Sequence, residues 1–87
     1  MHYTYRPRYV CSTQIDMEVN DGVITDVRFT GGCNGNLKAI GKLVNGMTAE
    51  QIEKTLRGNT CGPRPTSCAD QLAQAVRAAA EAERKAV

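Results

Sequence analysis

The sequence predicts an α+β fold, in which a three-stranded antiparallel sheet is followed by three helices packed on one face of the sheet. One supporting observation is the alternation of apolar and polar residues over residues 13–19 and 23–29, on either side of a turn sequence. Another is the helical spacing of apolar residues in three later segments that also contain capping residues. A length of 87 residues suits one small core, so we expect a single domain over residues 1–87.

The first strand is expected within residues 2–10. Tyr3, Tyr5 and Tyr9 alternate there with polar residues, and Pro7 interrupts the pattern. Because proline cannot donate to a strand ladder, this segment suits the edge of a sheet. The tyrosines and arginines of the segment could instead stack on nucleic-acid bases, but an edge strand with one face on the core is the favoured interpretation.

A β-hairpin is predicted over residues 13–29. The turn sequence Asn20-Asp21-Gly22 joins its two strands, and glycine accepts the positive φ that such turns require. The side chains expected to share a face are Ile15, Met17 and Val19 in the first strand and Val23, Thr25, Val27 and Phe29 in the second.

Two helices are expected next. The first ends at Asn45-Gly46, and the second begins at Thr48, which forms a capping box with Gln51, and stops at Gly58. The apolar residues at helical spacing are Leu37, Ile40, Leu43 and Val44 in the first helix and Ile52 and Leu56 in the second.

The last helix is expected to run from about Cys68 into the 80s. Ser67 and Asp70 have the spacing of a capping box at its start. Its inward-facing residues are expected to be Leu72, Ala75, Val76 and Ala79.

Composition excludes several functional classes. The net charge is only +2, so nucleic acid and anionic membranes are not expected partners. No apolar stretch is long enough to span a bilayer, and the first residues lack the apolar core of a secretory signal. We therefore expect a cytoplasmic protein.

The four cysteines, Cys11, Cys33, Cys61 and Cys68, are the main candidate site. In a reducing compartment thiols favour metal or redox chemistry over structural disulfides. Four thiolates are soft ligands that suit tetrahedral zinc or an iron–sulfur cluster. No CxxC pair is present, so the fold would have to bring the thiols together from separate loops.

The local sequence around the cysteines supports this interpretation. Cys33 and Cys68 lie at predicted helix starts, where backbone N–H groups stabilise thiolates. Glycines flank the cysteines and allow backbone N–H groups to approach sulfur. The alternative is that the cysteines are small buried hydrophobic residues.

Other candidate chemistry is sparse. His2 is a weaker candidate metal ligand near the chain start, and a catalytic cysteine–histidine pair is not expected. The glycine-rich turn Gly31–Gly35 could form an anion nest at a helix start. The sequence contains no GxGxxG, Walker or HExxH motif.

Several stretches resemble the TSCPD-domain proteins, in their small stand-alone four-cysteine branch. They are DGVITDVRFTGGCNGN at 21–36, LVNGM at 43–47, CG at 61–62 and TSCADQLA at 66–73. The resemblance covers roughly residues 9–80. Ala69 replaces the usual proline of the family motif, and proline is favoured but not required in the first turn of a helix.

The resemblance implies a protein related to ribonucleotide reductase. TSCPD domains also occur at the C-terminal end of cobalamin-dependent ribonucleotide reductases, so that reductase is an implied protein partner. The chain lacks the large barrel needed for radical chemistry, so we do not expect it to catalyse that reaction alone.

A more distant similarity is to the IscU/SufU/NifU N-terminal scaffold fold. That fold carries three cysteines in loops that Cys11, Cys33 and either Cys61 or Cys68 would match. The similarity implies iron–sulfur machinery as an alternative partner.

The leading hypothesis is that all four cysteines converge at one end of the sheet and bind zinc, or alternatively an iron–sulfur cluster. A closed four-thiolate site would be structural, because catalytic zinc keeps an open position. The alternatives are a thiol redox accessory that uses Cys61 and Cys68, an iron–sulfur carrier, and a nucleotide- or flavin-binding module.

Overall fold

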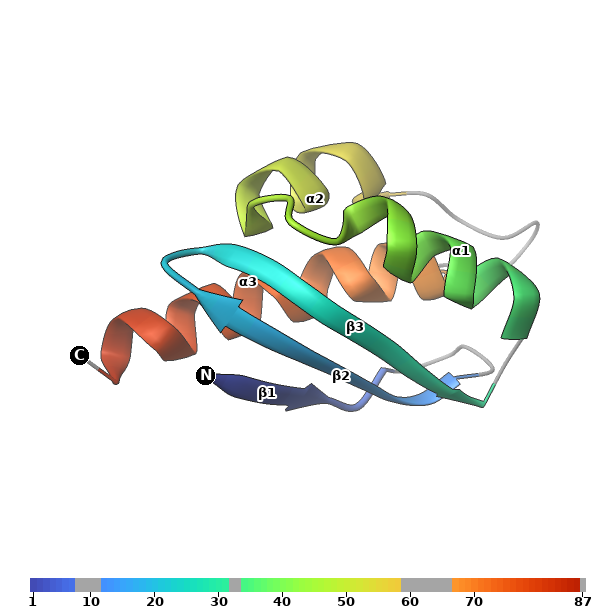
Figure 1. Cartoon of the computed structure of the whole chain (residues 1–87), viewed down its shortest axis with the longest axis horizontal. Coiled ribbons are helices and arrows are strands. Elements are labelled where there is room, and N and C mark those ends of the chain that lie inside the picture. The colour runs from blue at the N-terminus through green and yellow to red at the C-terminus, as the bar shows by residue number, and fades with distance from the viewer. Residues whose placement is uncertain (8–11, 32–33, 59–66, 87) are drawn as a thin grey trace.

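The computed structural model describes residues 1–7, 12–31, 34–58 and 67–86, and it confirms the expected α+β order (Figure 1). The three strands form one antiparallel sheet in the order β1-β2-β3. The elements are β1 (His2–Tyr5), β2 (Ser12–Asn20), β3 (Val23–Gly31), α1 (Asn34–Val44), α2 (Ala49–Leu56) and α3 (Cys68–Lys85).

The β2–β3 hairpin forms as predicted. Asp21 and Gly22 both have positive φ, 52° and 78°, which matches the tight turn whose twist suits a hairpin. Ile15, Met17 and Val19 are fully buried on one face of β2. The opposite face of the sheet is polar, so the helices cover only one side.

The predicted inward face of β3 is wrong in part, because the strand contains a bulge. Two residues of β3 lie opposite Met17 of β2, and one of them, Asp26, has a φ of 52°. The extra residue reverses the alternation of side chains. Ile24 is fully buried before the bulge, and Val27 and Phe29 pack against the core after it. Val23 and Thr25 are therefore not core residues.

The outer edge of β3 is covered by α1 and the segment after it. A side chain at Gly41 would place its Cβ 2.9 Å from the carbonyl oxygen of Val27, so only glycine allows this approach. Asn45 Oδ1 accepts the backbone N–H of Asp26 at 3.1 Å. The N–H of Ile24 donates to the carbonyl of Met47 at 2.9 Å. These contacts satisfy backbone groups of an edge strand and fix α1 to the sheet.

One of the four apolar residues at helical spacing in α1 does not face the core. Leu37 and Val44 are buried and Ile40 packs against the core, but Leu43 is 76% exposed. The apolar stripe of α1 that faces the sheet is therefore narrower than the sequence pattern predicts. The predicted end of the helix is correct, since Gly46 has a φ of 88°.

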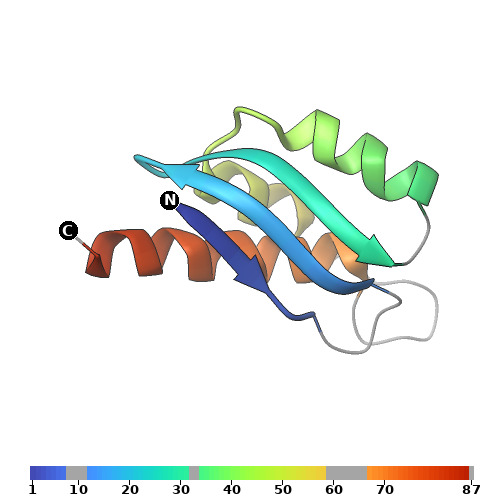
Figure 2. The ribbon, with the colours of Figure 1, turned by 60° about the horizontal axis from the view of Figure 1, so that its bottom comes forward.

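The other two helices complete the core. The capping box of Thr48 and Gln51 at the start of α2 is present. In Figure 2 the strands lie across α3, which packs against the buried face of the sheet, and α2 packs on α3. The four predicted inward residues of α3 are all fully buried: Leu72, Ala75, Val76 and Ala79. Within the described ranges, no helix is long and apolar enough to cross a membrane.

Candidate functional site

Of the four cysteines, the structure describes Cys68, whereas Cys11, Cys33 and Cys61 lie outside the described residues. Cys68 is the first residue of α3, as predicted, and is half-buried. Ser67 is the N-cap of this helix, and its Oγ accepts the backbone N–H of Asp70 at 3.1 Å. The cap fixes where α3 begins and thereby fixes the backbone position of Cys68.

The described chain neighbours of the other cysteines lie at the same end of the molecule as the start of α3 (Figures 1 and 2). Ser12, which directly follows Cys11, is paired with Gly31 at the open end of the hairpin. Asn34, which directly follows Cys33, begins α1. Ser12, Gly31, Asn34 and the start of α3 therefore lie at one end of the molecule.

Asp70 ties the end of α2 to the first turn of α3. Its buried carboxylate accepts the backbone N–H of Gly58 at 2.7 Å through Oδ1 and an N–H of Gln74 at 3.1 Å through Oδ2. Arg57 Nε lies 3.9 Å from the same Oδ1. Gly58 and Ser67 bracket the segment that carries Cys61, and Asp70 contacts both of them, Gly58 through its carboxylate and Ser67 through its backbone N–H. The sequence motif indicated only a cap at Asp70 and did not indicate the contact with Gly58.

Replacing Asp70 with Ala is expected to destabilise the protein by about 1.5–3 kcal/mol, because the N–H of Gly58 loses a charged acceptor. Chemical unfolding monitored by circular dichroism would measure this loss. Asp70→Asn keeps an acceptor oxygen and should retain more of the stability. Unfolding curves of Asp70→Ala that overlay those of the native chain would contradict the role given to this carboxylate.

His2 lies in a polar cluster on the open face of the sheet. Its Nδ1 is 2.8 Å from Glu18 Oε2, and its Nε2 is 3.1 Å from Asp16 Oδ1. Hydrogen bonds to Glu18 and then Asp16 raise the pKa of His2 above 6.5. Hydrogen bonds from Thr4 and Gln14 lower the pKa of Asp16.

His2 does not lie near the open end of the hairpin. It pairs with Glu18, which is six residues along β2 from Ser12, a separation of about 20 Å. The structure thus gives His2 partners of its own, far from the neighbours of the cysteines. Tyr3 and Tyr5 of the same strand pack against the core, as the edge-strand interpretation predicted.

Because the pKa of His2 is raised on folding, its contribution to stability should be complete below pH 6.5 and should be lost as pH rises through the folded value. An NMR titration of the His2 ring should give a pKa above 6.5 in the native chain and a lower one in Glu18→Gln. The unfolding midpoint of His2→Gln should approach that of the native chain as pH rises from 6 to 9. A His2 pKa at or below 6.5 would contradict this assignment.

A second cluster of charges surrounds a groove between the hairpin turn, α2 and α3. Glu83 accepts the backbone N–H groups of Asp21 at 2.8 Å and Gly22 at 2.9 Å. Arg77 Nη1 lies 3.3 Å from Glu53 Oε2, and Arg77 Nε lies 3.4 Å from Glu81 Oε1. The negative charge of Glu53 raises the pKa of Arg77 above its usual value. These groups bind one another and brace the turn against the helices.

Among residues 1–7, 12–31, 34–58 and 67–86, no three histidine, cysteine or acidic side chains are placed to hold a metal ion together. The candidate anion nest at Gly31–Gly35 includes Gly32 and Cys33, which lie outside the described residues.

The fold and the sequence define a small α+β domain with one cysteine at the start of its last helix and three more in the segments between its described elements. The model of the TSCPD domain family matches residues 2–80, so the chain belongs to that family. No curated protein and no solved structure gives a significant match.

Proposed function

We propose that this TSCPD-domain protein binds one zinc ion through Cys11, Cys33, Cys61 and Cys68, and that the ion stabilises the fold. Four thiolates complete a tetrahedral shell, which leaves no open position for a reacting water. The proposed ion therefore supplies structural stabilisation, and the proposed cellular role is an accessory to a larger enzyme of the ribonucleotide reductase type. An iron–sulfur cluster on the same thiols is the alternative occupant.

The observation that carries the proposal is the common location of the chain segments that flank the cysteines. Cys68 begins α3 at the end of the molecule where Ser12 and Gly31 pair. Cys11 is bonded to Ser12, and Cys33 follows Gly31 by two residues. Since consecutive Cα atoms are about 3.8 Å apart, these short connections limit how far either thiol can lie from the sheet end.

The contact between Asp70 and Gly58 adds independent support. It joins Gly58, three residues before Cys61, to Asp70, two residues after Cys68. Backbone N–H groups at the start of α3 stabilise negative charge, which suits a thiolate ligand more than a neutral thiol. The donor set and its surroundings therefore fit a soft, thiolate-binding metal ion.

Metal analysis of the purified chain tests the proposal. Protein prepared under reducing conditions should contain one zinc ion, or one iron–sulfur cluster, per chain, and each single Cys→Ser variant should retain much less metal. His2→Gln is the control variant, since His2 lies with Asp16 and Glu18, and it should retain the full metal content. Metal-free native protein that shows a reversible two-thiol oxidation would reject the metal role in favour of the redox alternative.

A further inference from the structure

We propose that the groove between β3 and α1 is a docking site for an acidic segment of another protein that also supplies an apolar side chain. The groove has a volume of about 420 Å³. Its charged and polar walls are formed by Asp26, Arg28, Lys38, Lys42 and Asn45, and we call it the basic groove. None of the described residues that line the groove is a proposed metal ligand.

The basic groove carries a local positive charge. Three of the eleven lysine and arginine residues of the chain line it together with one carboxylate, Asp26, which gives a local net charge of +2. Lys38 and Lys42 lie one helical turn apart, where like charges repel each other. An acidic ligand would relieve this repulsion.

The cations of the groove form no ion pair with any residue in the described part of the chain. Among the other cations of α2, α3 and their ends, Arg57 and Arg77 contact acidic side chains, whereas Lys54, Arg84 and Lys85 form no ion pair with the described residues either. Arg28 lies opposite Asp16 in the strand register, but hydrogen bonds from Thr4 and Gln14 engage the Asp16 carboxylate. The basic groove thus offers cations that the fold itself does not use.

An exposed apolar side chain lies on the neighbouring face of α1. Leu43 directly follows Lys42 and is 76% exposed, twice the exposed fraction of Met1 at 38%, the other exposed large hydrophobic residue of the described chain. Leu43 does not line the basic groove itself. A peptide that extends from the groove across α1 would cover this side chain, and burial of an apolar side chain is favourable.

The lining favours a protein segment over a nucleic acid. No aromatic side chain among the described residues lines the groove, so bases have no surface on which to stack. The Asp26 carboxylate would repel a continuous phosphate backbone, whereas a short peptide can place its acidic groups next to the three cations. The backbones on the two sides of the groove are held together, because α1 approaches Val27 closely at Gly41 and Asn45 accepts the backbone N–H of Asp26.

Selection from a displayed library of random peptides tests the proposal, with metal-replete native protein as bait. Peptides of about 12 residues are long enough to cross the groove. We expect the enriched sequences to combine acidic residues with a large apolar residue. An enriched peptide, synthesised and labelled, should bind the native protein saturably in fluorescence anisotropy, and its affinity should fall as salt is raised.

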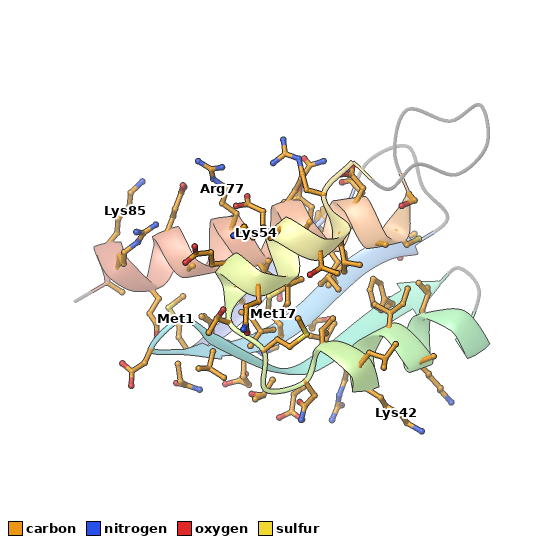
Figure 3. The ribbon with its side chains drawn as sticks, turned by 90° about the horizontal axis from the view of Figure 1, so that it is seen from above. Met1, Met17, Lys42, Lys54, Arg77 and Lys85 are labelled. Carbon is orange, nitrogen blue, oxygen red and sulfur yellow. The ribbon has the colours of Figure 1, made fainter. Side chains whose placement is uncertain are left out.

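Two double variants with the same change of net charge test whether the peptide binds at the basic groove or responds only to the overall charge of the protein. Lys38→Glu/Lys42→Glu should weaken the peptide by about tenfold or more, and Leu43→Ala by several-fold. Lys54→Glu/Lys85→Glu makes the same change of charge on α2 and α3, away from Lys42, and should leave affinity within about twofold (Figure 3).

The proposal is overturned if no peptide is enriched, if the enriched peptides lack acidic residues, or if the two double variants bind equally. If a single-stranded oligonucleotide binds more tightly than the peptide, and Leu43→Ala does not change its affinity, the groove would be assigned to nucleic acid instead. Cys→Ser variants that remain folded should keep peptide binding, so failure of the metal proposal and failure of this one give different results.

Discussion

Removal of zinc with a strong chelator is expected to unfold the protein. Structural zinc in small domains contributes about 10–16 kcal/mol of apparent binding free energy, which exceeds the total stability of most small domains. The core holds few large side chains, since the chain has three tyrosines, one phenylalanine and no tryptophan. In chains of below about 70–80 residues, slightly shorter than this one, the core alone rarely supplies more than about 3–5 kcal/mol. Circular dichroism during chelator titration should show loss of helix and strand signal.

Adding zinc back after chelation should restore the folded spectrum of the unsubstituted chain. It should not restore that of Cys68→Ser, which lacks one proposed ligand. The same chelator, saturated with zinc before it is added, is the matched control and should leave the spectrum unchanged. Protein that elemental analysis shows to be metal-free, and that keeps a native spectrum and a cooperative thermal transition, would contradict a structural role for the ion.

Replacing Leu72 with Ala is expected to destabilise the protein by about 2–5 kcal/mol. Leu72 is fully buried in the main core cluster, together with Ile15 of β2 and Ile52 of α2. Removing its side chain loses apolar burial and leaves a cavity that the surrounding helices and strands fill only in part. The midpoint of denaturant unfolding, measured with zinc present, should shift to lower concentration with little change in slope.

Leu43→Ala is the matched control for Leu72→Ala, because the same atoms are removed from a side chain that is 76% exposed. The free energy of unfolding of Leu43→Ala should differ from that of the native chain by less than about 0.5 kcal/mol. Equal losses in the two variants would contradict the assignment of Leu72 to the core and Leu43 to the surface.

The elements of the fold could be predicted because their signals are local. The alternation along β2, the Asp21-Gly22 turn and the capping residues Thr48 and Ser67 each depend on neighbouring residues alone. Each of these features is confirmed. The order of elements then follows from their order in the sequence.

Features that depend on contacts between distant segments were not predictable in the same way. The bulge at Asp26 changes which side chains of β3 face the core, and a regular alternation of residue types does not reveal an inserted residue. Leu43 has the correct helical spacing, but α1 packs along the edge of β3 and leaves that position outside. The contact of Asp70 with Gly58 joins two helices whose relative position no local pattern specifies.

The candidate site was predictable only at the level of residue type and location. Cys68 lies at the predicted helix start, and Ser12 and Gly31 pair near the positions of Cys11 and Cys33 in the chain. A shared metal remains a proposal, because ligation depends on side-chain geometry that spacing in the sequence does not specify. His2 is assigned instead to a cluster with Asp16 and Glu18.

X-ray absorption at the zinc edge of the purified protein tests the central proposal most directly. Four thiolate ligands predict a single shell of four sulfur atoms at about 2.3 Å, with no nitrogen or oxygen scatterer. Bound zinc surrounded by oxygen or nitrogen at about 2.0–2.1 Å, or by fewer than four sulfur atoms, would contradict the site formed by Cys11, Cys33, Cys61 and Cys68.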